Sequence, residues 1–193
     1  MKKINVGFTL IELLVVLAIA AILLLVAVPS YQGMIEKNNV ESAQEGLARS
    51  IAFARQEAIS RNATVSICRS ADGATCAASG EWNQGWIVFL DNDSSGAAGV
   101  VNTDDEVLRV NQSISANYGL QGSVAFVQFG NKGAVQLPAA GTPLFEVCSP
   151  SGDHLRGIML LRSGRGVTSR PTASGDYYIQ VDANGDPVAI SCS

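Results

Sequence analysis

The sequence predicts an α+β fold, in which one long N-terminal α-helix packs on an antiparallel β-sheet domain. Residues 8–28 are almost entirely apolar, and residues 40–58 place apolar or small side chains every three or four positions. After residue 62, short β-branched runs alternate with turn sequences, as is typical of antiparallel strands. We therefore divide the 193 residues into a leader over 1–7, an apolar helix over 8–29 and a globular domain over 30–193.

The apolar helix is predicted to cross a membrane. Residues 8–28 would extend about 31 Å at about 1.5 Å per residue, enough for a bilayer core about 30 Å thick. Lys2 and Lys3 would stay on the cytoplasmic side, where positive charge is retained. A cleaved secretory signal is the alternative, but its apolar run is shorter, about 7–15 residues, and ends at a small-residue cleavage site. Here the run ends at Pro29 without such a site.

Glu12 is the one carboxylate inside this apolar segment. A charged side chain inside a membrane helix costs about 2–3 kcal/mol or more and usually has a specific partner. Cleavage between Gly7 and Phe8 would create an ammonium group on Phe8. We expect a neighbouring subunit to present that ammonium to Glu12.

The globular domain is predicted to begin with an amphipathic helix over 30–62, followed by a β domain over 63–193. One stripe of this helix is expected to pack on the sheet, and the charged faces are expected to contact neighbouring subunits or solvent. Asn62 is the expected C-terminal stop. The stripe consists of Val40, Ala43, Leu47, Ile51, Ala54 and Ala58.

Eight segments of the β domain have strand-like sequences, and the last two are expected to form a hairpin around the turn at Asn184-Gly185, because Asn-Gly accepts positive φ angles. No internal repeat is evident. The predicted strands are residues 64–68, 85–90, 106–111, 123–129, 144–148, 157–162, 177–181 and 187–191.

The four cysteines all follow the apolar helix, and none forms a CxxC pair. This pattern does not favour zinc and indicates two disulfides in an oxidising compartment. Three pairings are open. Loop closure favours Cys68 with Cys76, which leaves Cys148 to pair with Cys192.

Other candidate sites have simpler structural interpretations. The segment 91–96 (DNDSSG) imitates the start of a calcium loop, but Asn102 occupies the position where that motif needs Glu, so we expect a hairpin turn. Trp82 and Trp86 are expected to pack in the core instead of forming a ligand platform. His154, the one histidine, has no nucleophile motif around it. We expect no catalytic site, no metal and no cofactor, and therefore no enzyme.

The string Gly7-Phe8-Thr9-Leu10-Ile11-Glu12 resembles the class III leader of type IV pilins and pseudopilins. The segments AFARQEAISRN (52–62) and WNQGWIVF (82–89) resemble the minor-pilin branch that includes FimU, FimT and the H-type pseudopilin of type II secretion. The resemblance implies a pilin-like fold, cleavage by a prepilin peptidase after Gly7, N-methylation of Phe8 and a role for Glu12 as the assembly carboxylate. It implies other minor pilins, a major pilin and the inner membrane as partners.

A local basic island follows His154, although the chain carries a net charge of −4 and is not a general polyanion binder. FimT-type members of the family hold DNA with a Gly-Arg-rich loop. Gly164-Arg165 matches that pattern, but Val167 stands where a second arginine is expected. A solvated loop and a subunit contact are the alternatives. The island consists of Arg156, Arg162, Arg165 and Arg170, with no acidic residue until Asp176.

The resemblance predicts a minor pilin of a type IV pilus that joins the tip or priming complex and promotes pilus biogenesis, and with it twitching, adhesion and DNA uptake. A DNA-binding competence pilin and an H-type pseudopilin of a type II secretion system are the alternatives. We expect the chain in the bacterial inner membrane with a periplasmic domain before assembly, and at the pilus tip afterwards.

Overall fold

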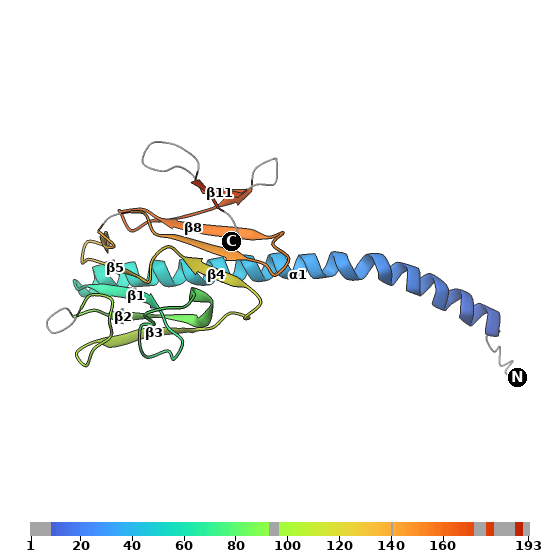
Figure 1. Cartoon of the computed structure of the whole chain (residues 1–193), viewed down its shortest axis with the longest axis horizontal. Coiled ribbons are helices and arrows are strands. Elements are labelled where there is room, and N and C mark those ends of the chain that lie inside the picture. The colour runs from blue at the N-terminus through green and yellow to red at the C-terminus, as the bar shows by residue number, and fades with distance from the viewer. Residues whose placement is uncertain (1–8, 93–96, 140, 172–176, 180–187, 191–193) are drawn as a thin grey trace, which may run out of the picture. The chain divides into compact units, whose positions relative to one another are not determined.

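The computed structural model describes residues 9–92, 97–139, 141–171, 177–179 and 188–190 (Figure 1). The chain forms two compact units, Met1–Asn38 and Asn39–Ser193. The helix α1, Leu10–Arg61, supplies all the described secondary structure of the first unit and the first element of the second.

In the first unit, α1 carries apolar side chains around its whole circumference. Every large apolar side chain from Leu10 to Leu25 is more than half exposed, and we call residues 10–25 the apolar segment of α1. Among the residues that the structure describes, no helix is both long enough and apolar enough to cross a membrane. The predicted span over 8–29 includes Phe8 and the side chains of 26–29, which lie outside the described part.

In the second unit, α1 ends where the sequence predicts. Asn62 has a φ of 51°, the left-handed conformation that terminates helices. The amide of Ala63 then donates to the carbonyl of Ala58 at 3.1 Å, which satisfies one of the last free carbonyls of the helix.

Two antiparallel sheets contact this part of α1, and in Figure 1 the green strands and the orange strands lie on either side of it. The first sheet has the order β3-β2-β1-β5-β6 and the second has the order β4-β7-β8-β9. In the first, the strands are β1 (Val65–Arg69), β2 (Gly85–Leu90), β3 (Glu106–Gln112), β5 (Phe126–Phe129) and β6 (Val135–Leu137).

The second sheet comprises β4 (Gly119–Gly122), β7 (Leu144–Cys148), β8 (Leu155–Leu160) and β9 (Gly166–Thr168). A third sheet has the order β10-β11-β12. Its strands are β10 (Arg170–Pro171), β11 (Tyr177–Ile179) and β12 (Val188–Ala189). The pairing of β11 with β12 agrees with the predicted hairpin, whose turn over 182–186 lies outside the described residues.

One hydrophobic core joins α1 to both larger sheets. All six residues of the predicted helical stripe are buried, from 0% to 8% exposed, so the prediction that the stripe packs on the sheets is confirmed. Trp82 and Trp86 also lie in this core, as expected. The Trp82 indole donates to the carbonyl of Val124 at 2.9 Å, and its ring meets the edge of Phe145 at 4.9 Å between centroids. The α+β fold is therefore confirmed.

The structure divides one predicted strand between two sheets. Residues 126–129 pair with β1, whereas the amide of Ser123 donates to the carbonyl of Leu144 at 2.8 Å beside β7. The sequence pattern also missed β4, which begins and ends with glycine. The glycine at 122 is required, because a Cβ there would lie 2.5 Å from the Trp82 indole nitrogen.

Candidate assembly surface

The first turn of α1 contains Glu12, the predicted assembly carboxylate. Thr9 precedes the helix, and its hydroxyl accepts from the amide of Glu12 at 3.3 Å. The Glu12 carboxylate in turn accepts from the amide of Thr9 at 3.5 Å. This reciprocal pair is a capping box, which satisfies two of the free amides at a helix start. Sequence reasoning missed this role, although the pattern Thr-x-x-Glu at 9–12 signals it.

The negative charge of Glu12 near the helix N-terminus interacts favourably with the helix dipole. The two capping hydrogen bonds are long, at 3.3 and 3.5 Å, and are therefore weak. The carboxylate of Glu12 is therefore placed at the helix start and held there weakly. Gly7 and Phe8, the predicted cleavage and methylation residues, lie outside the described residues.

The apolar segment of α1 starts directly at this carboxylate. Leu10 is 76% exposed and Leu25 is 77% exposed, although both are large apolar side chains. A helix that is apolar on all sides is normally covered by other helices or by lipid. Each fully covered leucine contributes about 1.5–3 kcal/mol. We therefore expect other helices or lipid to cover the apolar segment.

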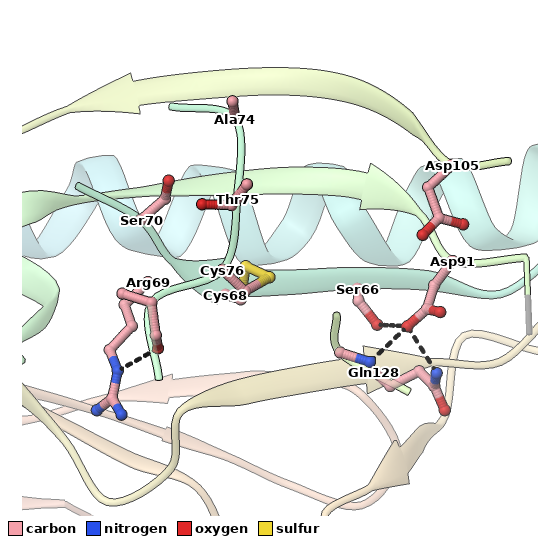
Figure 2. The surroundings of a disulfide bond; sticks show 12 residues. Ser66, Cys68, Arg69, Ser70, Ala74, Thr75, Cys76, Asp91, Asp105 and Gln128 are labelled. Atoms are coloured by element: carbon pink, nitrogen blue, oxygen red, sulfur yellow. Dashed lines mark hydrogen bonds between the residues drawn. A yellow bond between two sulfur atoms is a disulfide. The ribbon is translucent and has the colours of Figure 1, made fainter. Parts of the chain in front are cut away.

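The disulfide predicted between Cys68 and Cys76 is present, with 5.6 Å between the two Cα atoms (Figure 2). The neighbouring Arg69 fixes the residues that follow, because its guanidinium donates to the carbonyls of Ala77, Ala78 and Gly80 at 2.6–3.0 Å. None of the described cysteines is free. Cys148 is also disulfide-bonded, and its predicted partner Cys192 lies outside the described residues.

Asp72 organises the loop that the disulfide closes. The hydroxyl and amide of Thr75 and the amide of Ala74 donate to its carboxylate at 2.7–2.9 Å. Ser70 adds a hydroxyl at 3.0 Å. These bonds, first of all that from the Thr75 hydroxyl, hold the pKa of Asp72 well below its ordinary value, because they favour the ionised form.

Asp91 is the start of the segment for which we predict a turn. Its side chain is 2% exposed, and one carboxylate oxygen accepts from Ser66, Gln128 and the amide of Gly99 at 2.5–3.0 Å (Figure 2). It therefore connects β1, β5 and the loop after β2. Within the described ranges, no group of three or more His, Cys, Asp or Glu side chains can hold a metal ion. Residues 93–96 lie outside those ranges.

The structure separates Arg156 from Arg162 and Arg165 in the basic island. Arg156 on β8 pairs with Glu41 on α1 at 2.5 Å, and its side chain is only 11% exposed. Arg162 and Arg165 are exposed at the turn between β8 and β9, where Arg162 donates to the carbonyl of Pro138 at 2.6 Å. Arg170 lies in β10, and its side chain is outside the described part.

Known proteins resemble this chain in sequence and in fold. A family model of the type II transport protein GspH matches residues 43–164, which is more than half of the chain. A model of the prokaryotic N-terminal methylation motif matches residues 7–28. No curated protein matches the chain significantly.

Two crystal structures of the type IV minor pilin FimU from Pseudomonas aeruginosa share the fold at 21% sequence identity. In space group P65 the TM-score is 0.51 over 67% of this chain and 92% of FimU. In space group P21 it is 0.53 over 83% of this chain and 99% of FimU.

The family accounts for several features described above. Its members are structural proteins and not enzymes, which confirms the expectation that this chain is no enzyme. Membership also implies assembly with other pilins. The methylation motif covers both the predicted cleavage position and the apolar segment. The chain therefore belongs to the GspH family and is a minor pilin or pseudopilin.

Proposed function

We propose that this protein is a minor pilin of a type IV pilus, which joins the tip or priming complex and promotes the start of pilus assembly. The main support is the apolar segment of α1, which is exposed on all sides and lies within the matched methylation motif. Before assembly the protein resides in the inner membrane with a periplasmic domain. A prepilin peptidase cuts between Gly7 and Phe8 and methylates Phe8.

Assembly then covers the apolar segment with the helices of neighbouring pilins. The carboxylate of Glu12 pairs with the terminal ammonium of a neighbouring subunit. This ion pair fixes the axial position of one helix relative to the next. The weak capping bonds to Thr9 permit this exchange, because an ionic contact in an apolar environment is stronger than a 3.5 Å bond to a backbone amide.

The first experiment is a count of surface pili by electron microscopy in a strain that lacks this gene, compared with the wild type and with a complemented strain. We expect pili to become rare or absent without the gene. Normal piliation would contradict the proposal. In that case a secretion assay for type II substrates tests the H-type pseudopilin alternative.

Two substitutions separate the assembly role of Glu12 from its capping role. Glu12→Gln keeps a capping side chain but removes the charge, whereas Thr9→Ala removes the capping hydroxyl and keeps the charge. We expect Glu12→Gln to abolish complementation of piliation and Thr9→Ala to retain most of it. If both variants complement equally well, Glu12 has no assembly role.

A second candidate function is DNA binding at the turn between β8 and β9, which is supported by the exposure of Arg162 and Arg165. The assay is DNA retention by the detergent-solubilised full chain at increasing salt. Loss of one phosphate contact in Arg165→Ala should reduce the slope of log affinity against log salt by about 1. Lys37→Ala, which removes an exposed cation on α1, is the control. No retention at low salt would exclude this function.

A further inference from the structure

A cavity of about 420 Å³ lies between α1 and the end of β3, within the second unit. We propose that it binds a carboxylate group of a small acid or of a chain terminus. This volume is within the range of ligand pockets, about 300–1,000 Å³. The cavity is lined in part by Asn39, Gly46 and Arg49 on α1, together with Trp86, Asn111 and Tyr118.

Two hydrogen-bond donors on residues that line the cavity have no partner among the described residues. The indole nitrogen of Trp86 and the amide nitrogen of Asn111 are both buried, and neither makes a hydrogen bond to a residue that the structure describes. The indole of Trp82, by contrast, donates to the carbonyl of Val124. Buried polar groups are nearly always paired, so two unpaired donors in one cavity wall call for an explanation.

The strand register places these two donors side by side. Trp86 on β2 lies directly opposite Asn111 on β3, so both side chains project from the same face of the sheet. Trp86 belongs to the core that packs against α1, which shows that this face is the one toward the helix. A carboxylate offers two adjacent acceptor oxygens, which suits two adjacent N–H groups. Both nitrogens are closed off from solvent in this structure, so a carboxylate reaches them only with a small movement of the cavity wall.

The remaining polar groups also favour an anion. None of the described residues that line the cavity is Asp or Glu. Arg49 is paired with Glu45 at 3.1 Å, but both side chains are about two-thirds exposed, so this pair is easily exchanged for another. Asn39 donates to the Tyr118 hydroxyl at 2.9 Å, which leaves the hydroxyl proton for a further acceptor. The cavity thus presents donors and a cation.

Gly46, one of the residues that line the cavity, is a suitable position for a blocking variant. A Cβ at this helical position meets nothing within 4 Å. Gly46→Leu therefore places its Cβ in open space and the rest of its side chain in the cavity, and it also replaces a poor helix former by a good one. Gly46→Ala is the matched control, because it changes helix propensity and leaves most of the cavity open.

The chain has two tryptophans, so the test can follow two indole N–H signals by NMR of the ¹⁵N-labelled full chain in detergent micelles. Trp86→Phe assigns them. The probes are glucuronate against glucose, and triglycine against triglycine amide. We expect a saturable shift of the Trp86 signal with a carboxylate of either type, no matching shift with the counterpart that lacks the carboxylate, and an unmoved Trp82 signal. We also expect Gly46→Leu to weaken the response at least tenfold and Gly46→Ala to retain it.

A response to glucuronate alone assigns the site to a free acid, and a response to triglycine alone assigns it to a chain terminus. The proposal is overturned if neither acid shifts the Trp86 signal, if the probes that lack the carboxylate shift it equally, or if Gly46→Leu responds like the wild type.

Discussion

Gly164→Ala tests whether the turn between β8 and β9 is held against the rest of the domain by close packing. Gly164 has a φ of 78°, and a Cβ at this position would lie 1.9 Å from the carbonyl oxygen of Gly133. The same oxygen accepts a hydrogen bond from the guanidinium of Arg55 at 3.0 Å. An alanine therefore strains its own backbone and displaces the carbonyl that Arg55 holds.

Gly152→Ala separates these two costs. Gly152 has the same φ of 78°, but a Cβ there meets nothing within 4 Å. Both variants incur the strain of the left-handed conformation, about 1–2 kcal/mol. In Gly164→Ala the carbonyl must also move by about 1 Å, which breaks a hydrogen bond to a charged donor worth about 1.5–3 kcal/mol. We expect Gly164→Ala to be less stable than Gly152→Ala by about 2 kcal/mol.

The measurement is thermal and urea unfolding of both full-length variants in detergent, followed by circular dichroism. A difference of about 2 kcal/mol corresponds to about 4–8 °C in melting temperature for a chain of this size. If the two variants unfold within about 1 °C of each other, the turn moves freely away from Gly133 and the reasoning is wrong.

Three further predictions concern the cysteine loop and the link between α1 and β8. Replacing Cys68 and Cys76 together by serine should cost about 2–3 kcal/mol in urea unfolding, because the disulfide closes a short loop with a sequence separation of 8. The pKa of Asp72 is lowered in the folded state, so ionised Asp72 stabilises the wild type relative to Asp72→Asn. This stability difference should be complete above about pH 4 and should be lost as the pH falls further through the folded pKa. A stability difference that is unchanged at about pH 2 would contradict this prediction. Arg156→Met alone should destabilise by about 1–2 kcal/mol, and adding Glu41→Leu should recover part of that loss in a double-mutant cycle.

The sequence predicts those features that depend on local periodicity. The stripe from Val40 to Ala58 is visible because a helix repeats every 3.6 residues, and all its members are buried. The stop at Asn62 is visible because Asn accepts a positive φ. The strand β4 is not visible, because its two glycines have low strand propensity and one of them is selected by the packing of Trp82.

Asp91 shows why a turn-like sequence does not reveal burial. A run of Asp, Asn, Ser and Gly predicts an exposed loop. The carboxylate is nevertheless buried, because Ser66 lies 25 residues earlier and Gln128 lies 37 residues later, and both donate to it. Such a contact depends on the pairing of β1 with β2 and β5, which no local pattern encodes.

The basic island shows that arginines close in sequence do not all lie on one surface. Three of its arginines have described side chains, and the packing of β8 on α1 gives Arg156 different surroundings from Arg162 and Arg165. Arg156 faces Glu41, which is 115 residues away in the chain, and this pair neutralises it. A test of polyanion binding should therefore centre on Arg165, with Arg162 as the second site. If Arg165→Ala leaves the salt slope of DNA retention unchanged, clustering in sequence has no counterpart as a binding surface in this protein.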